Sequence, residues 1–563
     1  MNVTKARRTA IGAVAGVLAG AAALGVGQFV AGLTGASSSP VVAVGQLQID
    51  FTPPWLKNWA IDHFGSDDKL VLVTGILIVL GLFAAAVGAI ATRRLVYGMA
   101  GLGVFAVVGL TASATRPTAT FSSMLPTLAA IATAIVVLLV LERRIAPLPA
   151  ASVDALKAGE ASGTPAVAEL ADGGPAGDEL AAPDLPGAAR TPAVPTPAAP
   201  ARQVWAVPEP RRRSFLAAGA VTLGVTAVAG LAGRILTERA SVAKFISTLR
   251  IPKPVKALPP LPAGVNLNVP GISPFITSDS EFYRVDTAIV LPQVNPQSWQ
   301  LRIHGMVSRE ITLTFDDLIR RPLIEDYITL CCVSNPVAGP YVGNALWLGA
   351  SLSSVLREAG IKAGADQLLC TSVDGFTSGT PIQTVMDGRD ALLAVAMNGQ
   401  PLPVAHGFPA RMVVPGLYGY VSATKWVTDI EVTTFAGNYA YWAQRGWSQQ
   451  APIKTESRID VPTGNGPLKP GTVTVAGVAW AQHKGIDAVE VQIDNGPWHV
   501  ATLSEVPGID CWRQWAWNWE ATAGNHMISA RATDDTGYTQ TSLQAPPEPN
   551  GASGYPQVQV TVV

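Results

Sequence analysis

The sequence predicts a multidomain protein with an α-helical transmembrane N-terminal region of five spans, an α+β domain and a C-terminal immunoglobulin-like β-sandwich. Three observations predict it. Apolar runs almost free of charge fill the first third of the 563-residue chain, an ordinary globular composition begins at about Phe245, and helical periodicity disappears after about Pro467. Only 14% of the residues are charged, against about 25% in soluble domains, because the charge-poor runs lie together at one end.

Five apolar runs are long enough to cross a bilayer, which takes about 20 residues. They are residues 9–33, 70–92, 95–114, 124–141 and 215–233. Buried core helices are the alternative, but five such runs, several ending at an arginine pair, favour membrane spans. We therefore expect residues 1–144 to form a four-span region of the cell (inner or plasma) membrane, surrounded by lipid.

The basic residues between these spans indicate their orientation. Arg7 and Arg8 precede the first span, Arg93 and Arg94 follow the second, and an arginine pair at 143–144 follows the fourth. Basic residues concentrate on the cytoplasmic side of a membrane, so the N-terminus is predicted to be cytoplasmic. Residues 35–69 and the loop near residue 116 then lie outside. Residues 145–210, rich in Ala and Pro and poor in aromatics, are predicted to be a disordered cytoplasmic linker.

The segment 211–240, which begins "RRRSFLAAGA", contains the fifth span. Its Arg212, Arg213, Phe215 and Leu216 resemble the twin-arginine export signal, whose route carries folded proteins. A simple positive-inside anchor is the alternative. Both interpretations place the remainder of the chain outside the cytoplasm, behind a retained anchor.

Residues 241–466 mix strand-like runs such as "WQLRIHG" with helical patterns, which indicates an α+β domain. Thr314 before "FDDLIRR" and Ser351 before "LSSVLREAG" are expected helix N-caps. Residues 467–563 alternate in the manner of strands, and "DNGPW" predicts a hairpin. This spacing is typical of an immunoglobulin-like sandwich.

Two adjacent cysteines, Cys331 and Cys332, end a strand-like run in "YITLCCVSN". Successive strand residues point to opposite faces, so at most one of them can face a site. The alternative is a pair of small buried hydrophobic residues. The net charge of −1 argues against nucleic acid as the main partner.

Several motifs resemble, in the same order, those of the sulfite oxidase family of molybdopterin enzymes. They are "TLCCVSN", "NALWLGASL", "VDGFTSGTPI", "HGFPARMVVPGLYGYVSATKW" and the terminal "PNGASGYPQVQV". The likeness covers residues 282–563 and is closest to a membrane-tethered bacterial branch. It implies a molybdenum–molybdopterin cofactor in the α+β domain. It also implies a homodimer formed through the β-sandwich.

The family pattern Thr-Leu-x-Cys-x-x-Asn assigns the molybdenum ligand to Cys332 and a cofactor-binding role to Asn335. Molybdenum held by soft pterin sulfurs accepts a further thiolate readily. Cys331 is then expected to pack into the core behind it. The resemblance implies further site residues, each from a matching motif. Catalytic roles fall on Arg284 and Trp347, although Trp347 is also compatible with a plain core aromatic. Cofactor binding falls on Tyr283, Asp286, Asp374, Thr377, His406, Arg411, Ser422 and Lys425, of which the last four would bind the pterin phosphate; a surface-loop role is the alternative for His406.

One departure from the family concerns the substrate. An arginine pair that binds the anionic substrate in the animal enzyme is replaced here by Pro336 and Val337, which slightly favours a substrate other than sulfite. Arg445 is a candidate replacement. The predicted spans contain no histidine, so a bis-histidine b-type haem is excluded within this chain and a separate electron carrier is expected.

The sequence therefore predicts an extracytoplasmic, membrane-anchored molybdopterin oxidoreductase that transfers an oxygen atom to or from a small sulfur compound or oxide. Reduction of an S-oxide or N-oxide is the alternative within the same fold, and a non-catalytic membrane-tethered binding module is the alternative from another class. A transporter is disfavoured because the first four spans carry no Asp, Lys or His near their centres.

Overall fold

The structure, a computed structural model, describes residues 3–53, 56, 59, 63–64, 68–116, 119–145, 209–239 and 242–563. The predicted linker 145–210 lies, apart from its ends, outside the described residues. In the part that is described, the chain forms two compact units. The first takes residues from Met1–Val26, Gly75–Val107 and Ala129–Ala229, and the second from Gly27–Thr74, Val108–Leu128 and Gly230–Val563.

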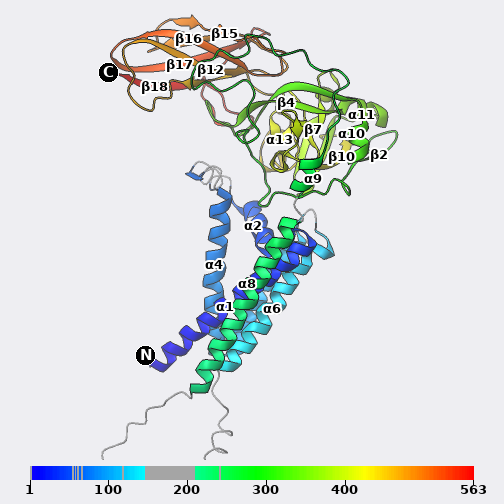
Figure 1. The fold of residues 1–563 in the computed structure, drawn as a ribbon, viewed down its shortest axis with the longest axis vertical. Helices are drawn as coiled ribbons and strands as arrows, with labels where there is room; N and C mark the ends of the chain where they lie inside the picture. Colours follow the sequence, from blue (N-terminus) through cyan, green and yellow to red (C-terminus); the bar gives the residue numbers. More distant parts are fainter. Residues whose placement is uncertain are drawn as a thin grey trace, which may run out of the picture. The chain divides into compact units, whose positions relative to one another are not determined.

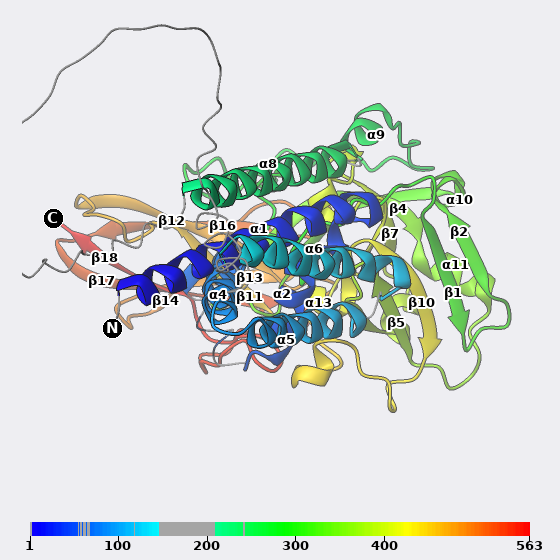
Figure 2. The same cartoon turned by 90° about the horizontal axis from the view of Figure 1, so that it is seen from below.

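Among the described residues, five helices are long and apolar enough to cross a membrane, which is the number of spans expected. They are α1 (Val3–Thr34), α4 (Asp68–Ala91), α5 (Leu95–Ala114), α6 (Phe121–Ile145) and α8 (Glu209–Arg239), and Figures 1 and 2 show α1, α6 and α8 side by side. In the first unit α1 and α4 meet at Gly16 and Gly88, where a Cβ atom would overlap the backbone of the facing helix. Small residues allow this close approach without the hydrophobic drive that water provides.

The second unit also contains the short helices α2 (Pro40–Phe51) and α9 (Ala243–Thr248). Its α+β part begins with a five-stranded sheet ordered β2-β1-β10-β5-β6. The strands are β1 (Gln300–Gly305), β2 (Ile311–Thr314), β5 (Gln367–Ser372), β6 (Thr377–Pro381) and β10 (Val427–Thr433). β1 and β10 run parallel, whereas the other neighbours in this sheet are antiparallel.

A second sheet carries the two adjacent cysteines. It runs β3-β4-β7-β8, with β9 paired to β7. Its strands are β3 (Leu323–Cys331), β4 (Val342–Ser351), β7 (Leu392–Met397), β8 (Gln400–Pro401) and β9 (Arg411–Val413). Every residue of β7 is buried, and one apolar core cluster joins both sheets to the helices that cover them.

The short helices of this part begin as the sequence predicts. They are α10 (Phe315–Arg320), α11 (Leu352–Ala359), α12 (Ile382–Met386) and α13 (Gly419–Ser422). Thr314 and Asp317 form a reciprocal capping box at α10, and Ser351 accepts a hydrogen bond from Ser354 N at α11. Both N-cap predictions are confirmed.

The C-terminal region is β-rich, and Figure 1 shows its strands gathered together. Two four-stranded antiparallel sheets, β11-β12-β16-β15 and β14-β13-β17-β18, share one apolar core. The strands are β11 (Glu456–Val461), β12 (Gly471–Trp480), β13 (Ile486–Ile493), β14 (Trp498–Val500), β15 (Thr502–Leu503), β16 (Arg513–Ala521), β17 (Gly524–Asp534) and β18 (Gln557–Val562). The first sheet thus takes β11 from residues before Pro467.

Candidate functional site

The two cysteines at the end of β3 lie in different surroundings. Cys331 is completely buried and belongs to the apolar core cluster. Cys332 follows the strand, is 8% exposed and lies outside that cluster, with its Sγ 2.9 Å from Ser334 Oγ. Burial raises the pKa of both thiols, whereas the nearby Lys425 ammonium acts to lower the pKa of Cys332 alone. The two thiols therefore differ in their surroundings, and the assignment of Cys332 to a site stays a prediction.

The loop that follows Cys332 is closed by its own polar groups. Cys332 N donates to Tyr341 O at 2.9 Å, and Asn335 Oδ1 accepts from Tyr341 N at 2.8 Å. Asn335 is buried, and its side chain lies beside the Cys331 thiol. Its amide nitrogen has no nitrogen or oxygen partner among the described residues. Asn335 thus shapes the loop and leaves a buried donor close to the cysteines.

Hydrogen bonds connect the C-terminal region to β3 and to this loop. Thr329 N donates to Asp510 O at 2.9 Å, Thr329 Oγ1 accepts from Trp512 N at 2.7 Å, and Gln482 Nε2 donates to Thr329 O at 2.8 Å. Arg458 on β11 donates to Gly339 O at 3.1 Å. Sequence reasoning missed these contacts because the partners lie more than a hundred residues apart and no local pattern marks them.

Arg411, the first residue of β9, is a buried cation with no ion pair to any carboxylate among the described residues. Its guanidinium donates over long distances to backbone carbonyls, 3.2 Å to His406 O and 3.4 Å to Ala423 O, and it lies 4.9 Å above the Trp347 ring. Burial lowers its pKa to about 10, so it remains charged at neutral pH. A buried charge left unpaired is costly, which indicates that an anion belongs beside it.

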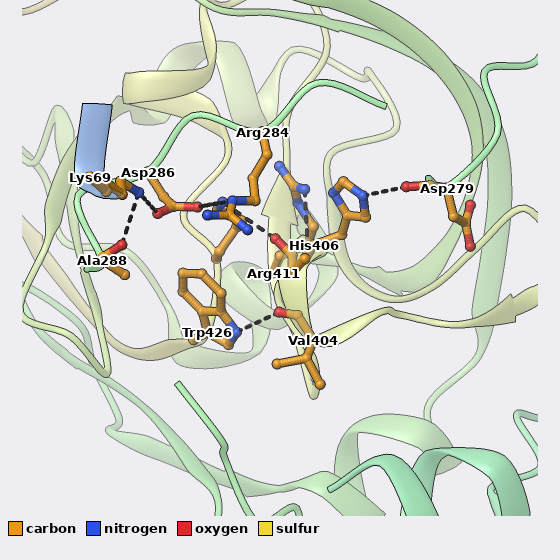
Figure 3. A network of polar contacts seen from close by, with 11 residues as sticks. Lys69, Asp279, Arg284, Asp286, Ala288, Val404, His406, Arg411 and Trp426 are labelled. Carbon is orange, nitrogen blue, oxygen red and sulfur yellow. Dashed lines mark hydrogen bonds and ion pairs between the residues drawn. The ribbon is translucent and has the colours of Figure 1, made fainter. Parts of the chain in front are cut away.

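Asp286 forms ion pairs with three further cations, and Figure 3 shows this cluster. Its Oδ1 lies 2.7 Å from Lys69 Nζ, and its Oδ2 lies 2.8 Å from Lys425 Nζ and 3.3 Å from Arg284 Nε. Although burial acts to raise the pKa of Asp286, the lysines outweigh it and lower that pKa to about 2. Burial lowers the pKa of Lys425 to about 8. Lys425 and Arg284 share one oxygen of this carboxylate, which again favours an anionic ligand beside them.

His406 completes the group (Figure 3). It is buried, and its Nε2 lies 2.8 Å from the carbonyl oxygen of Asp279, to which it donates. Burial and the neighbouring cations lower its pKa to about 4, so the imidazole is neutral at pH 7 and its Nδ1 is an acceptor. Tyr283 lies near the cysteines. Its hydroxyl and the Cys331 carbonyl oxygen both border Gly419, since a Cβ atom added to that glycine would lie 3.6 Å from each of them. The structure therefore brings together Tyr283, Arg284, Asp286, His406, Arg411 and Lys425.

Four other predicted site residues use their polar groups within the protein. Asp374 Oδ1 accepts from Phe376 N in the β5–β6 turn, and Thr377 Oγ1 accepts from Tyr441 N. Ser422 is fully buried and donates to Leu417 O and Tyr418 O, so it does not complete the cation group as expected. Trp347 is fully buried and donates to Ile328 O, which supports the core interpretation instead of a pocket wall. Arg445 packs on the Tyr441 ring and donates to Tyr441 O at 2.8 Å.

A buried carboxyl that the sequence did not suggest lies on the core side of the cysteines. Glu456, the first residue of β11, has an Oε1 without a hydrogen-bond partner in the described part of the chain. Burial raises its pKa to about 8, only partly opposed by Lys454, so it is protonated at neutral pH. Its negative form would in turn raise the pKa of Cys331 and Tyr418. Its influence on the Cys331 thiol indicates that Glu456 lies near the cysteines.

These residues fit a metal carried by an anionic cofactor better than a metal held by the chain alone. Among the described residues no group of three or more His, Cys, Asp or Glu could hold a metal ion. What they present instead is the Cys332 thiol within the electrostatic influence of Lys425, together with a buried guanidinium and a cation-rich cluster. A thiolate can supply one ligand to a soft metal, and an arginine fork suits a phosphate.

Comparison with known proteins shows which family part of this chain resembles. The family described as "Oxidoreductase molybdopterin binding domain" matches residues 288–442. The chain is 30% identical over 325 residues to the sulfite oxidase of Gallus gallus, covering 48% of this chain and 69% of that protein. It is 28% identical over 323 residues to the mitochondrial sulfite oxidase of Mus musculus, of whose length it spans 58%. A solved structure, the sulfane dehydrogenase SoxCD of Paracoccus pantotrophus, aligns with a TM-score of 0.43 at 24% identity, covering 47% of this chain and 75% of that one.

Proposed function

The chain belongs to the sulfite oxidase family of molybdopterin-dependent oxidoreductases, and on that premise we propose that it is a membrane-anchored enzyme whose catalytic domain lies outside the cytoplasm. Its reaction is a two-electron oxygen-atom transfer on a small sulfur compound or oxide. The observation that carries this proposal is the positive charge around Arg411 and Asp286, together with the Cys332 thiol within the electrostatic influence of Lys425.

Molybdenum–molybdopterin, when bound, supplies the two-electron chemistry, and the chain supplies ligand, orientation and electrostatics. Cys332 would provide the thiolate ligand, because a bound metal keeps a coordinating thiol deprotonated. Arg411 and Lys425 would bind the pterin phosphate, with the neutral His406 holding the adjoining loop through Asp279 O. Asn335 and Tyr283, close to the cysteines, would contact the remainder of the cofactor. Asp286 would orient Lys425 and Arg284 without touching the anion.

The substrate is proposed to be something other than the sulfite dianion. Pro336 and Val337 occupy the loop positions where the animal enzymes carry a substrate-binding arginine pair. The loop next to Cys332 therefore contributes no cation, which favours a neutral or singly charged sulfur compound, or an S-oxide or N-oxide reduced by the same chemistry. A separate protein or carrier would exchange the electrons.

The location outside the cytoplasm is supported by the grouping of the chain. The two loops expected outside, which fall in Gly27–Thr74 and Val108–Leu128, form one compact unit with Gly230–Val563. We propose the domain limits 1–144, 145–210, 211–240, 241–466 and 467–563, with the last an immunoglobulin-like domain that mediates a homodimer and whose first sheet is completed by β11 from before residue 467. The segment at Arg212 and Arg213 would act as an export signal and remain as an anchor.

The deciding experiment is elemental and pterin analysis of the full-length protein purified in detergent from cells that assemble molybdopterin enzymes. We expect molybdenum and pterin in equal amounts, close to one per chain. Turnover is then measured with sulfite, other small sulfur compounds, S-oxides and N-oxides, with Cys332→Ser as the inactive control. A wild-type protein that contains neither molybdenum nor pterin would overturn the proposal. Turnover of sulfite alone would contradict the substrate class.

A further inference from the structure

Lys69 links a candidate membrane helix to the cation cluster of the cofactor domain. It is the second residue of α4, directly before the apolar part of that helix. Its Nζ lies 2.7 Å from Asp286 Oδ1 and 2.9 Å from Ala288 O, 217 and 219 residues further along the chain (Figure 3). All three residues belong to the second compact unit. The lysine thus bonds to the domain and not only to its own helix.

The two oxygens of Asp286 are divided between two groups of cations. Oδ1 is bound by Lys69, whereas Oδ2 is bound by Lys425 and Arg284. The Asp286 side chain is only 4% exposed and that of Lys69 22%, so water screens these interactions weakly. One carboxylate can compensate about one cation. Because Lys69 takes up part of the negative charge of Asp286, less of that charge is left to compensate Lys425.

A lysine at the end of a membrane helix usually extends its ammonium to the lipid headgroups. Here the ammonium instead meets a buried carboxylate and a backbone carbonyl in the domain. This contact holds the ammonium at fixed positions on two protein groups, whereas contact with lipid headgroups fixes no single position. A helix that served only as an anchor would not need such a fixed contact.

We propose that Lys69 is a positioning residue of the cofactor site, which holds Asp286 by Oδ1 and so directs Lys425 and its charge toward the anionic group of the cofactor. The proposal rests on the proposed function, because the anion it serves is the pterin phosphate. It gives the start of α4 a role beyond anchoring. The segment that carries Lys69 completes the site electrostatically, and a catalytic domain without this segment would retain its cofactor poorly.

The juxtaposition is tested by cross-linking in the full-length protein. Lys69→Cys is combined with Ala288→Cys, a protease site is placed within residues 145–210, and a short bifunctional thiol reagent is applied to membranes. We expect the two fragments to stay joined after cleavage. The matched control combines Lys69→Cys with Lys256→Cys, an exposed position, and should leave the fragments separate. Equal yields from the two pairs would contradict the contact.

The charge role is tested by cofactor retention, measured as molybdenum and pterin per chain after gel filtration. Lys69→Met should lower retention several-fold, and Lys69→Arg should preserve it because the arginine keeps a positive charge beside Asp286 Oδ1. Lys253→Met, at an exposed lysine, is the control and should retain the cofactor fully. Wild-type retention in Lys69→Met would overturn this inference while leaving the proposed function intact. A wild-type protein without pterin would overturn the proposed function, and the inference with it.

Discussion

The hydroxyl of Thr329 accepts a hydrogen bond from the backbone amide of Trp512 at 2.7 Å, which ties the strand before the two cysteines to the C-terminal region. The same hydroxyl donates to Asn344 Oδ1 at 3.0 Å, so both of its hydrogen-bonding roles are used in a fully buried place. The β-rich region is therefore part of the framework that holds the cysteine loop.

Replacing this hydroxyl should destabilise the protein. Thr329→Val keeps the shape but leaves the Trp512 amide unsatisfied, and we expect a loss of about 1–3 kcal/mol in the free energy of unfolding. Thermal unfolding of the full-length protein in detergent measures it. Thr312→Val, at an exposed position on β2, is the matched control and should change little. Equal melting temperatures for the two variants would contradict the role given to Thr329.

The two cysteines should respond differently to the same change. Cys332→Ser should abolish turnover and leave most of the pterin bound, because a hydroxyl is a poor replacement for a soft thiolate. Cys331→Ser should keep activity and lose about 1–3 kcal/mol of stability by burying a hydroxyl in the core. Molybdenum content, turnover and melting temperature of both variants check this. If Cys331→Ser proves to be the inactive one, the ligand assignment is off by one residue.

Arg411→Lys should weaken cofactor binding although the charge is kept. The lysine ammonium cannot present the two parallel donors of a guanidinium to a phosphate, and losing one charge-assisted hydrogen bond of about 1.5 kcal/mol corresponds to about tenfold in affinity. Pterin retained per chain after dilution measures the effect. The control is Arg320→Lys, an exposed arginine on α10. Retention equal to that of the control would exclude Arg411 from the anion site.

Glu456 should make stability depend on pH. Its pKa of about 8 in the folded protein lies above the ordinary value of 4.5, so between these values the folded state holds a proton that the unfolded state has released. Its contribution to stability is therefore full at low pH and is lost as the pH rises through that window. Glu456→Gln removes this dependence. Melting temperatures recorded from about pH 5 to about pH 9 should shift in favour of the variant as the pH rises. A constant difference would show that Glu456 is ionised in the fold.

Membrane topology provides an independent check. A reporter fused after Val563 should lie outside the cytoplasm, whereas one placed within residues 145–210 should lie inside. Replacing Arg212 and Arg213 by Lys should block export if the twin-arginine route is used, and should change little if they act only as positive charges. Protease accessibility and reporter activity in intact cells distinguish these outcomes. A cytoplasmic C-terminus would contradict both the orientation and the export proposal.

Local patterns predicted well whatever depends on neighbours along the chain. Hydropathy identified the five helices that are long and apolar enough to cross a membrane within a few residues of the ends observed, because such a helix is defined by its own apolar length. Thr314 and Ser351 were recognisable as N-caps from the residues next to them. The alternation of strand faces was enough to separate Cys331 from Cys332. Motifs within "EFYRVD" and "HGFPAR" led to the cation cluster, whereas the same reasoning misjudged Ser422, whose hydroxyl is used by its own turn.

By itself the sequence determined the five apolar helices, the α+β and β-rich regions and the family. The tertiary structure alone decided that Asp286 binds Lys69 across 217 residues, that Thr329 receives the Trp512 amide, and that Arg411 has no ion pair to a carboxylate among the described residues. The reason is physical. Hydropathy and strand alternation act between near neighbours along the chain, whereas ion pairs and desolvation depend on distances in space that only the folded chain sets.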